Sequence, residues 1–281
     1  MILLRTRCFG LRSSFSALKH RSFSSDGPIR ESLFYLHDTL TCPWSFTIVA
    51  TTVIIRALVT LPLSLHQRQM SKRSLQIQPL LSAWKNTIDK TVSTQSISSK
   101  NQKMTLTDQQ VKIRTMYRDH ARILYSKFNC NPMKQIVLPL IQIPIFIYMT
   151  MEVRNLAGFD FLWFTADPAA AGMLTEGILW FTDLTVCDPT LIGPIILGTL
   201  QLVNTELNNL LRISTPSTIS RVLTIVFRAL SVLMIYVATQ VPAAVLLYWI
   251  TSAAFSIFQN GLFLLYETFR PSNNRIPVIK N

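Results

Sequence analysis

Residues 44–65 read WSFTIVATTVIIRALVTLPLSL, and this stretch decides the fold class of the chain. As a helix it would be about 33 Å long, which is enough to cross a hydrocarbon core of about 30 Å. Each of its large apolar side chains favours insertion by about 0.3–0.6 kcal/mol, so together they outweigh the cost of one charge. The stretch therefore predicts a membrane-spanning helix.

The charge in this stretch is Arg56, near its centre. An arginine at the centre of a bilayer costs about 2.5–3.5 kcal/mol on insertion scales, so it is expected to face water, protein or a polar groove. Thr52 and Thr60 lie four residues before and after Arg56 and would share its face in an α-helix. Two interpretations follow: a hydrated groove around Arg56, or an arginine that snorkels or pairs structurally.

Four further apolar runs predict further spans, and the expected fold class is an all-α polytopic membrane protein. Hydrophobic residues make up 49% of the chain and charged residues 15%, so five transmembrane helices leave little sequence for a soluble core. The expected segments are a presequence at 1–23, an amphipathic segment at 24–43, spans at 44–65, 133–151, 190–206, 219–239 and 242–266, a helical hairpin at 66–132, a loop at 152–189 and a tail at 267–281.

The first 25 residues differ in composition from the rest. They contain five basic residues and six serines, and no acidic residue precedes Asp26. This composition is typical of a mitochondrial presequence, whereas a secretory signal would need an apolar centre without interruption by arginine. The run Arg21-Ser22-Phe23-Ser24 resembles a matrix processing site with cleavage after Phe23. The sequence thus predicts import into mitochondria and removal of residues 1–23.

The charges of the connecting segments predict the topology. Residues 67–132 carry twelve basic residues against three acidic ones, whereas residues 152–189 carry one basic residue against six acidic ones. Basic connections stay on the side from which insertion starts. In the mitochondrial inner membrane this places the hairpin and the C-terminus in the matrix, and the mature N-terminus and the acidic loop in the intermembrane space.

The basic segment is expected to form an antiparallel helical hairpin. Residues 68–88 have a helical pattern that Pro79 should bend or break, and Thr107 to Gln110 fit a capping box that opens a second helix running to about Phe128. Its cations could meet an acidic substrate, ribosomal nucleic acid or anionic lipid. They could equally set topology alone. On the other side, residues 28–40 predict a short amphipathic helix at the membrane surface.

The other predicted spans also carry polar residues. Such residues usually join transmembrane helices, but several stripes together with Arg56 favour a shared hydrophilic groove. The predicted groove residues are Arg56, Thr52, Thr60, Gln142, Gln201, Asn204, Ser252 and Gln259.

Signals for catalysis and for cofactors are absent from the sequence. The four histidines have no metal-ligand spacing, and there is no nucleotide-binding loop, zinc-protease motif or nucleophile elbow. We therefore expect no enzyme activity, no cofactor and no metal. Cys42 and Cys187 would face the same oxidising compartment, where they could form a disulfide or remain as thiols.

Five sequence blocks, taken in order, resemble one family. They are Arg56 in the first span, Ile77-Gln78-Pro79, the run 131–146 (NPMKQIVLPLIQIPIF), the run 179–184 (LWFTDL) with Asp188-Pro189, and the run 241–252 (VPAAVLLYWITS) with Gln259. In this order they resemble the membrane insertases of the YidC and mitochondrial oxidase-assembly type.

The resemblance is greatest to the cytochrome c oxidase assembly branch of that family. It implies insertion of membrane proteins and export of the C-terminal part of cytochrome c oxidase subunit two into the intermembrane space. The implied partners are hydrophobic membrane-protein clients, the lipid bilayer and accessory assembly factors. The tail after Tyr266 is short, so neither stable ribosome binding nor nucleic-acid specificity is expected. The alternatives are a multi-pass transporter or channel for a small anion, and an assembly scaffold that does not translocate its client.

Overall fold

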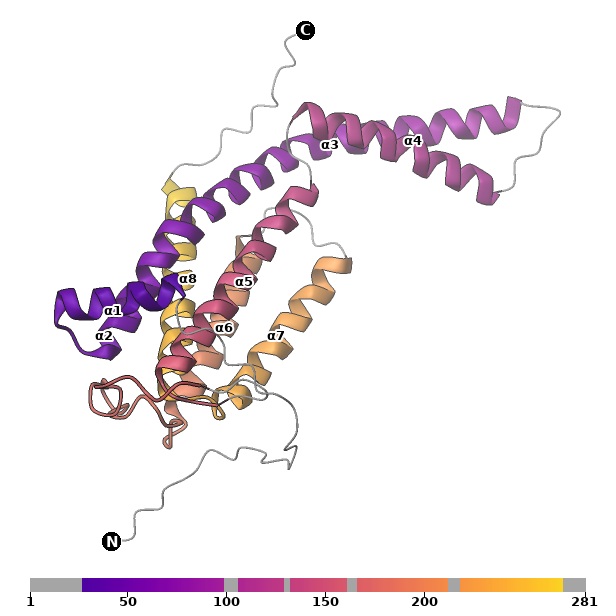
Figure 1. The fold of residues 1–281 in the computed structure, drawn as a ribbon. Helices are drawn as coiled ribbons and strands as arrows, with labels where there is room; N and C mark the ends of the chain where they lie inside the picture. Colours follow the sequence, from indigo (N-terminus) through magenta and orange to yellow (C-terminus); the bar gives the residue numbers. More distant parts are fainter. Residues whose placement is uncertain (1–26, 99–105, 129–131, 161–165, 212–217, 270–281) are drawn as a thin grey trace, which may run out of the picture. The chain divides into compact units, whose positions relative to one another are not determined.

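The computed structural model describes residues 27–98, 106–128, 132–160, 166–211 and 218–269, so the predicted presequence lies outside the described residues. The regular elements of this part of the chain are helices, which confirms the all-α class (Figure 1). They are α1 (Pro28–Leu40), α2 (Trp44–Ile55), the π-helix η1 (Arg56–Thr60), α3 (Leu61–Ser98), α4 (Leu106–Lys127), α5 (Pro132–Leu156), α6 (Ile192–Leu210), α7 (Thr218–Ala238) and α8 (Ala243–Phe269).

The chain divides into two compact units. The first comprises Met1–Leu61 and Gln142–Arg270, and the second comprises Pro62–Ile141 and Pro271–Asn281. Within the first unit, α6 packs against both α7 and α8, and α2 packs against α8 (Figure 1). The N-terminal half of α8 is the centre of this unit, because every residue from Ala243 to Trp249 is buried.

Small residues allow these helices to approach closely. A Cβ atom on Gly193 of α6 would lie 2.7 Å from Cδ2 of Leu246 in α8. A Cβ atom on Gly198, also in α6, would overlap the side chain of Ile235 in α7. Helices in a membrane associate through van der Waals contact at small residues, because lipid offers no hydrophobic driving force between them. Glycine at these two positions therefore sets the packing of α6.

Three helical stretches among the described residues are long and apolar enough to cross a membrane. They are Trp44–Thr94, Arg221–Ala238 and Ala243–Tyr266. They agree with a polytopic membrane protein. The further spans predicted at 133–151 and 190–206 fall on α5 and α6, and the count of five remains a prediction.

The first span differs from its predicted form in two ways. Residues 44–65 were expected to form one α-helix, but the α-helical pattern changes to a π-helix at Arg56–Thr60, and the helix continues far beyond residue 65. Its apolar side chains Phe46, Val53 and Leu58 are exposed. Its polar side chains Ser45, Thr47, Thr51 and Thr52 are buried. These polar residues thus face the protein and these apolar residues face outward. This arrangement suits a lipid environment, because polar side chains are costly to expose to hydrocarbon.

Helix α1 covers the start of α2. Leu33 is fully buried in the core of the first unit, and the ring of Phe34 meets Trp44 edge-on at 5.3 Å. Leu40, at the other end of the predicted apolar face, is 44% exposed. The predicted amphipathic face is therefore shared between protein packing and the surface of the molecule.

The second unit contains the two long helices of the basic segment. Ile77 and Leu81 of α3 pack with Ala121 of α4 in a small apolar core. Pro79 was expected to bend or break this helix, and the helix is not broken there, since Pro79 lies inside α3. Proline removes one backbone hydrogen bond from a helix. Ile77 and Leu81 flank Pro79 and share the same core, so their packing supports the helix on both sides of the proline.

Candidate functional site around Arg56

Arg56 stands at the point where α2 becomes η1. The backbone N–H of Leu61 donates to the carbonyl of Arg56, five residues earlier, which is the π-helical pattern. The side chain of Arg56 is half-buried and its Nη2 donates a hydrogen bond to Oγ of Ser252 in α8. Single π-helical turns inside α-helices occur frequently at functional sites. The structure thus joins Arg56 to Ser252, two of the residues that the sequence predicts for one groove.

Tyr248 belongs to the same site, although the sequence analysis did not include it among the groove residues. Its ring is buried, and it lies near enough to Arg56 for an electrostatic interaction. The hydroxyl of Tyr248 donates to the carbonyl of Phe146 in α5 at 3.5 Å. Tyr248 lies one helical turn before Ser252, so helical spacing predicts that the two share one polar face of this span. Helix α8 thus presents a hydroxyl-bearing face to Arg56.

Helix α5 holds this face of α8 in place. The indole Nε1 of Trp249 donates to Oγ1 of Thr150 at 3.1 Å, and the ring of Phe146 lies 5.5 Å from that of Tyr248 and 6.2 Å from that of Trp249. These contacts orient α8 so that Ser252 can meet Arg56.

The two threonines predicted beside Arg56 have different surroundings. Thr52 is 1% exposed and its hydroxyl donates to the carbonyl of Ile48 at 2.6 Å, within the same helix. Thr60 is half-buried at the end of η1. The prediction of a common face assumed α-helical spacing between Arg56 and Thr60, and the π-helix changes that spacing. Thr51, which the sequence analysis omitted, is buried with a hydroxyl that has no hydrogen-bond partner in the described part of the chain.

Asn204 forms hydrogen bonds with residues other than Arg56, and these bonds join α6 to α8. Its Nδ2 donates to the carbonyl of Ala253 at 3.3 Å. Nδ2 of Asn260 donates to Oδ1 of Asn204 at 3.2 Å and to Oδ1 of Asn208 at 3.3 Å. Buried amides that bond across two helices stabilise their packing. Asn260 was not predicted, and its position directly after Gln259 gave no separate signal.

The three glutamines of the prediction lie on three helices. Gln142 of α5 and Gln201 of α6 are half-buried, and Gln259 of α8 is 7% exposed. All eight predicted residues fall in the first unit. Arg56 and Ser252 form a direct contact, and the assignment of the others to one groove stays a prediction.

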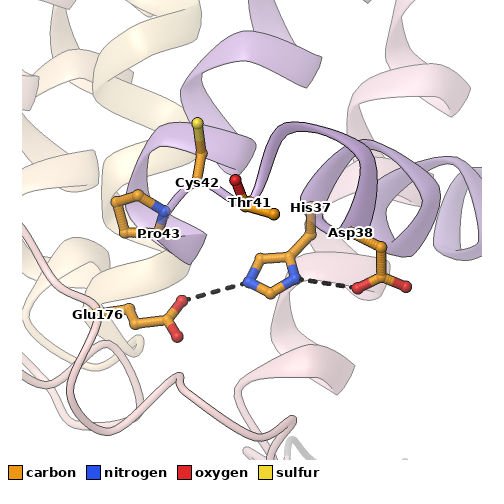
Figure 2. Close-up of a pocket in the computed structure, with 6 residues that line it drawn as sticks. All are labelled: His37, Asp38, Thr41, Cys42, Pro43 and Glu176. Carbon is orange, nitrogen blue, oxygen red and sulfur yellow. Dashed lines mark hydrogen bonds and ion pairs between the residues drawn. The ribbon is translucent and has the colours of Figure 1, made fainter.

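A pocket lies at the start of α2, away from the predicted groove residues in sequence (Figure 2). It has a volume of about 550 Å³ and is lined by His37, Asp38, Thr41, Cys42, Pro43 and Glu176. His37 stacks on Trp44 at 4.2 Å, and Figure 2 shows its ring between two carboxylates, with Nε2 3.3 Å from Glu176 and Nδ1 3.3 Å from Asp38. These contacts fix α1 to the loop before α6.

Cys42 carries a free thiol in this pocket, so the disulfide with Cys187 that the sequence left open is not formed. Among the residues that the structure describes, no group of three or more His, Cys, Asp or Glu side chains is arranged to hold a metal ion.

Comparison with known proteins identifies the family. Residues 35–268 match the family described as 60Kd inner membrane protein. The mitochondrial cytochrome c oxidase assembly protein COX18 of Pongo abelii is 32% identical over 257 residues, which are 86% of this chain and 72% of the relative. The corresponding protein of Schizosaccharomyces pombe is 29% identical over 221 residues, which are 78% of this chain and 91% of the relative.

A second group of relatives is more distant. The mitochondrial inner membrane protein OXA1L of Mus musculus is 25% identical over 246 residues, which are 88% of this chain and 51% of that protein. The matched region includes the arginine-bearing first span and the whole of α8 up to Thr268. The chain therefore belongs to the 60Kd inner membrane protein family, the family of YidC and the mitochondrial oxidase-assembly insertases that its sequence blocks resemble.

Proposed function

We propose that this chain is an insertase of the mitochondrial inner membrane that supports the assembly of cytochrome c oxidase. The observation that carries the proposal is Arg56, a half-buried cation in an apolar helix that is held by Ser252 of the central helix α8. The similarity to the COX18 proteins, which are named as cytochrome c oxidase assembly proteins, supports it. The family acts in membrane insertion and assembly rather than in a known class of catalysis.

The proposed mechanism follows from the cost of moving polar chain through lipid. Each unsatisfied backbone group in hydrocarbon costs several kcal/mol. A hydrated groove that contains Arg56 would shorten the apolar path, and its cation would attract acidic groups of the passenger. The apolar helix of the passenger would then leave sideways into lipid. Gln142, Gln201 and Gln259 are the further polar residues that we assign to this groove.

Partitioning and the membrane potential supply the energy in this proposal, since the sequence contains no nucleotide-binding motif. The potential provides about 2.3 kcal/mol per elementary charge for each 100 mV. Because the matrix side is negative, the potential favours export of acidic segments. Arg56 would thus recruit the same segments that the potential moves outward.

The proposed client is cytochrome c oxidase subunit two, whose C-terminal part would be exported into the intermembrane space. In the proposed orientation the basic segment and the C-terminus face the matrix, and the loop before α6 faces the intermembrane space. The charge difference between these segments supports this orientation.

The alternative functions receive no support from the comparisons. A transporter for a small anion would be expected to contain paired broken helices from an internal repeat. A scaffold that binds its client without moving it differs from an insertase in one measurable respect, which is the location of the client's C-terminus.

The test is to deplete the protein and to follow newly made subunit two in mitoplasts by protease protection. We expect its C-terminal part to become protected, because it stays in the matrix, while an unrelated inner-membrane protein stays accessible. Normal export of subunit two after depletion would contradict the insertase function. Export that continues while the oxidase fails to assemble would favour the scaffold.

A further inference from the structure

Helix α7 packs on α6 and is otherwise largely uncovered. Only 11% of its apolar stretch Arg221–Ala238 is buried, compared with 61% of the stretch Ala243–Tyr266 in α8. Its large apolar side chains Ile225, Val232 and Tyr236 are 62%, 59% and 67% exposed. Lipid tails are as apolar as these side chains and can cover them. Their exposure alone therefore does not indicate a protein partner.

A charged pair lies among these side chains and changes this conclusion. Arg228 of α7 donates to Glu206 of α6 through two hydrogen bonds, at 2.7 Å and 3.0 Å. Arg228 is seven residues beyond Arg221, which is about 10 Å into the apolar stretch. The side chains of Arg228 and Glu206 are nevertheless 52% and 49% exposed. Ionisable side chains inside a membrane almost always face protein or a water-filled cavity, so this half-exposed pair indicates that protein covers it.

The pair belongs to a surface formed by one exposed row of side chains on each helix, which we call the α6–α7 face. Each row advances by three or four residues, which is the spacing of one helix face and of a contact between two helices. The rows are Thr199, Val203 and Glu206 on α6, and Ile225, Arg228 and Val232 on α7.

The α6–α7 face points away from the central helix α8. Asn204 lies two residues before Glu206, about 200° away around α6, and it donates to the carbonyl of Ala253 in α8. Glu206 is thus on the other side of α6 from the contact with α8. A partner bound at the α6–α7 face would leave α8, with Ser252 and its bond to Arg56, outside the interface.

We propose that the α6–α7 face is an interface between two copies of this chain. The face carries one cation and one anion side by side, so it is complementary to itself. Two copies with the same orientation in the membrane are related by a twofold axis along the membrane normal, and each residue then meets residues at its own depth. Glu206 and Arg228 share a depth, because they bond to each other. Arg228 of each copy therefore meets Glu206 of the other.

The chemistry of the pair favours a second copy over a partner of a single charge. The guanidinium group has N–H donors beyond the two that bind Glu206 in its own copy. A purely acidic or purely basic partner would bring a charge without a counter-charge to an already neutral pair, which is costly in a buried site. A second copy brings one charge of each sign. Two guanidinium and two carboxylate groups then form a neutral network that hydrocarbon does not reach.

The first test is disulfide formation between copies in isolated mitochondrial membranes. Two differently tagged chains without their native cysteines are co-expressed, one with Val203→Cys and the other with Val232→Cys. The helices are antiparallel, since Thr224 bonds to Asn209 and Arg228 to Glu206. Val203 and Val232, each about one turn from the charged pair on the same side, therefore share a depth.

The control uses Leu230→Cys in place of Val232→Cys. Leu230 is also exposed and lies at nearly the same depth, but about 200° away around α7. A disulfide needs Cα atoms within about 7 Å, so under mild oxidation we expect a product with both tags from Val232→Cys and none from Leu230→Cys. Equal yields, which random collision in lipid would give, would overturn the proposal. So would the lack of a product from Val232→Cys, which coverage by lipid or by another protein would give.

The second test reverses one charge in each of two copies. Glu206→Arg makes both charges of the pair positive, and Arg228→Glu makes both negative. Expressed alone, each variant should associate with itself about tenfold less than the unchanged chain, because like charges meet at the interface. Expressed together with different tags, the two variants should associate with each other, as measured by co-purification in mild detergent relative to abundance. Mixed association no stronger than self-association would overturn the proposal. The cross-linking test contains neither variant, so it decides the question even where one of them does not accumulate alone.

Discussion

At the scale of single residues, the hydrogen bond from Arg56 to Ser252 indicates whether the charge or the shape of the side chain matters at position 56. The partner is one hydroxyl oxygen, and not a carboxylate that would match the planar fork of arginine. Lysine carries the same charge and can donate to a hydroxyl group. The charge at residue 56 should therefore matter more than the shape of the side chain.

Replacement of Arg56 tests this directly. Arg56→Lys should retain much of the export of subunit two, whereas Arg56→Ala should reduce it about ten- to hundredfold, the equivalent of a charge-assisted interaction of about 1.5–3 kcal/mol. Removing the charge eases insertion of the helix itself, so Arg56→Ala should accumulate normally. Pulse-labelling with protease protection gives the export rate, and immunoblotting gives the abundance. Ser252→Ala should reduce export less than Arg56→Ala. A loss of abundance in both the lysine and the alanine variants would instead assign Arg56 to structure.

A second prediction at this scale concerns Asn260. Its amide joins Asn204 and Asn208 of α6 to α8, so Asn260→Ala should lower the free energy of unfolding by about 0.6–1.7 kcal/mol, the range for polar contacts between membrane helices. Ser256→Ala is the control, because its hydroxyl bonds within its own helix, to the carbonyl of Ser252 at 3.0 Å. Unfolding in mixed detergent micelles measures both. Equal stability of the two variants would show that the amide contacts contribute nothing to the packing of α6 on α8.

At the scale of elements, α6 and α7 are held together by charge as well as by close contact. Arg228 of α7 binds Glu206 of α6 through two hydrogen bonds, Nε to Oε1 at 2.7 Å and Nη2 to Oε2 at 3.0 Å. Next to this pair, Oγ1 of Thr224 donates to Oδ1 of Asn209 at 3.0 Å. Both charged groups are about half exposed. In a bilayer, charges at such positions depend on each other, because lipid does not solvate them.

Exchange of these two charges tests the pairing. Glu206→Arg and Arg228→Glu alone should each place like charges together and reduce the amount of folded protein. The double exchange should restore it, because the ion pair is formed again in the opposite sense. Steady-state abundance and thermal aggregation in detergent measure the effect. Additive losses in the double variant would mean that the two residues act independently.

At the scale of the whole molecule, the prediction concerns topology. Thr94 at the end of the first helical stretch and Thr175 in the loop before α6 are both exposed. In a cysteine-free chain, Thr175→Cys should react with a membrane-impermeant maleimide in mitoplasts, whereas Thr94→Cys should react only after solubilisation. The physical reason is the charge difference between their segments. Equal reactivity of the two cysteines in mitoplasts would refute the five-span arrangement.

Much of this fold was predictable because its signals are local. Hydropathy over about 20 residues identifies a membrane helix, so the stretches at Trp44–Thr94, Arg221–Ala238 and Ala243–Tyr266 were foreseen, apart from their limits. Arg56 could be identified from the sequence because a charged residue within an apolar stretch is visible without knowing which residues it contacts. The π-helix at Arg56 was not foreseen, and whether Pro79 would bend or break its helix was left open, since both depend on packing against other helices.

The sequence alone determined the helical class and the family and singled out Arg56 as a candidate, because composition, motif order and hydropathy can be read without knowing which helices meet. Only the tertiary structure decided which residues each of these side chains contacts. Arg56 bonds to a serine 196 residues away, Asn204 bonds to Ala253 and Asn260 of α8, and Glu152 is buried under Gly27. Helical periodicity gives each side chain a face, but which face meets which neighbour is set by the close packing of small residues between distant segments.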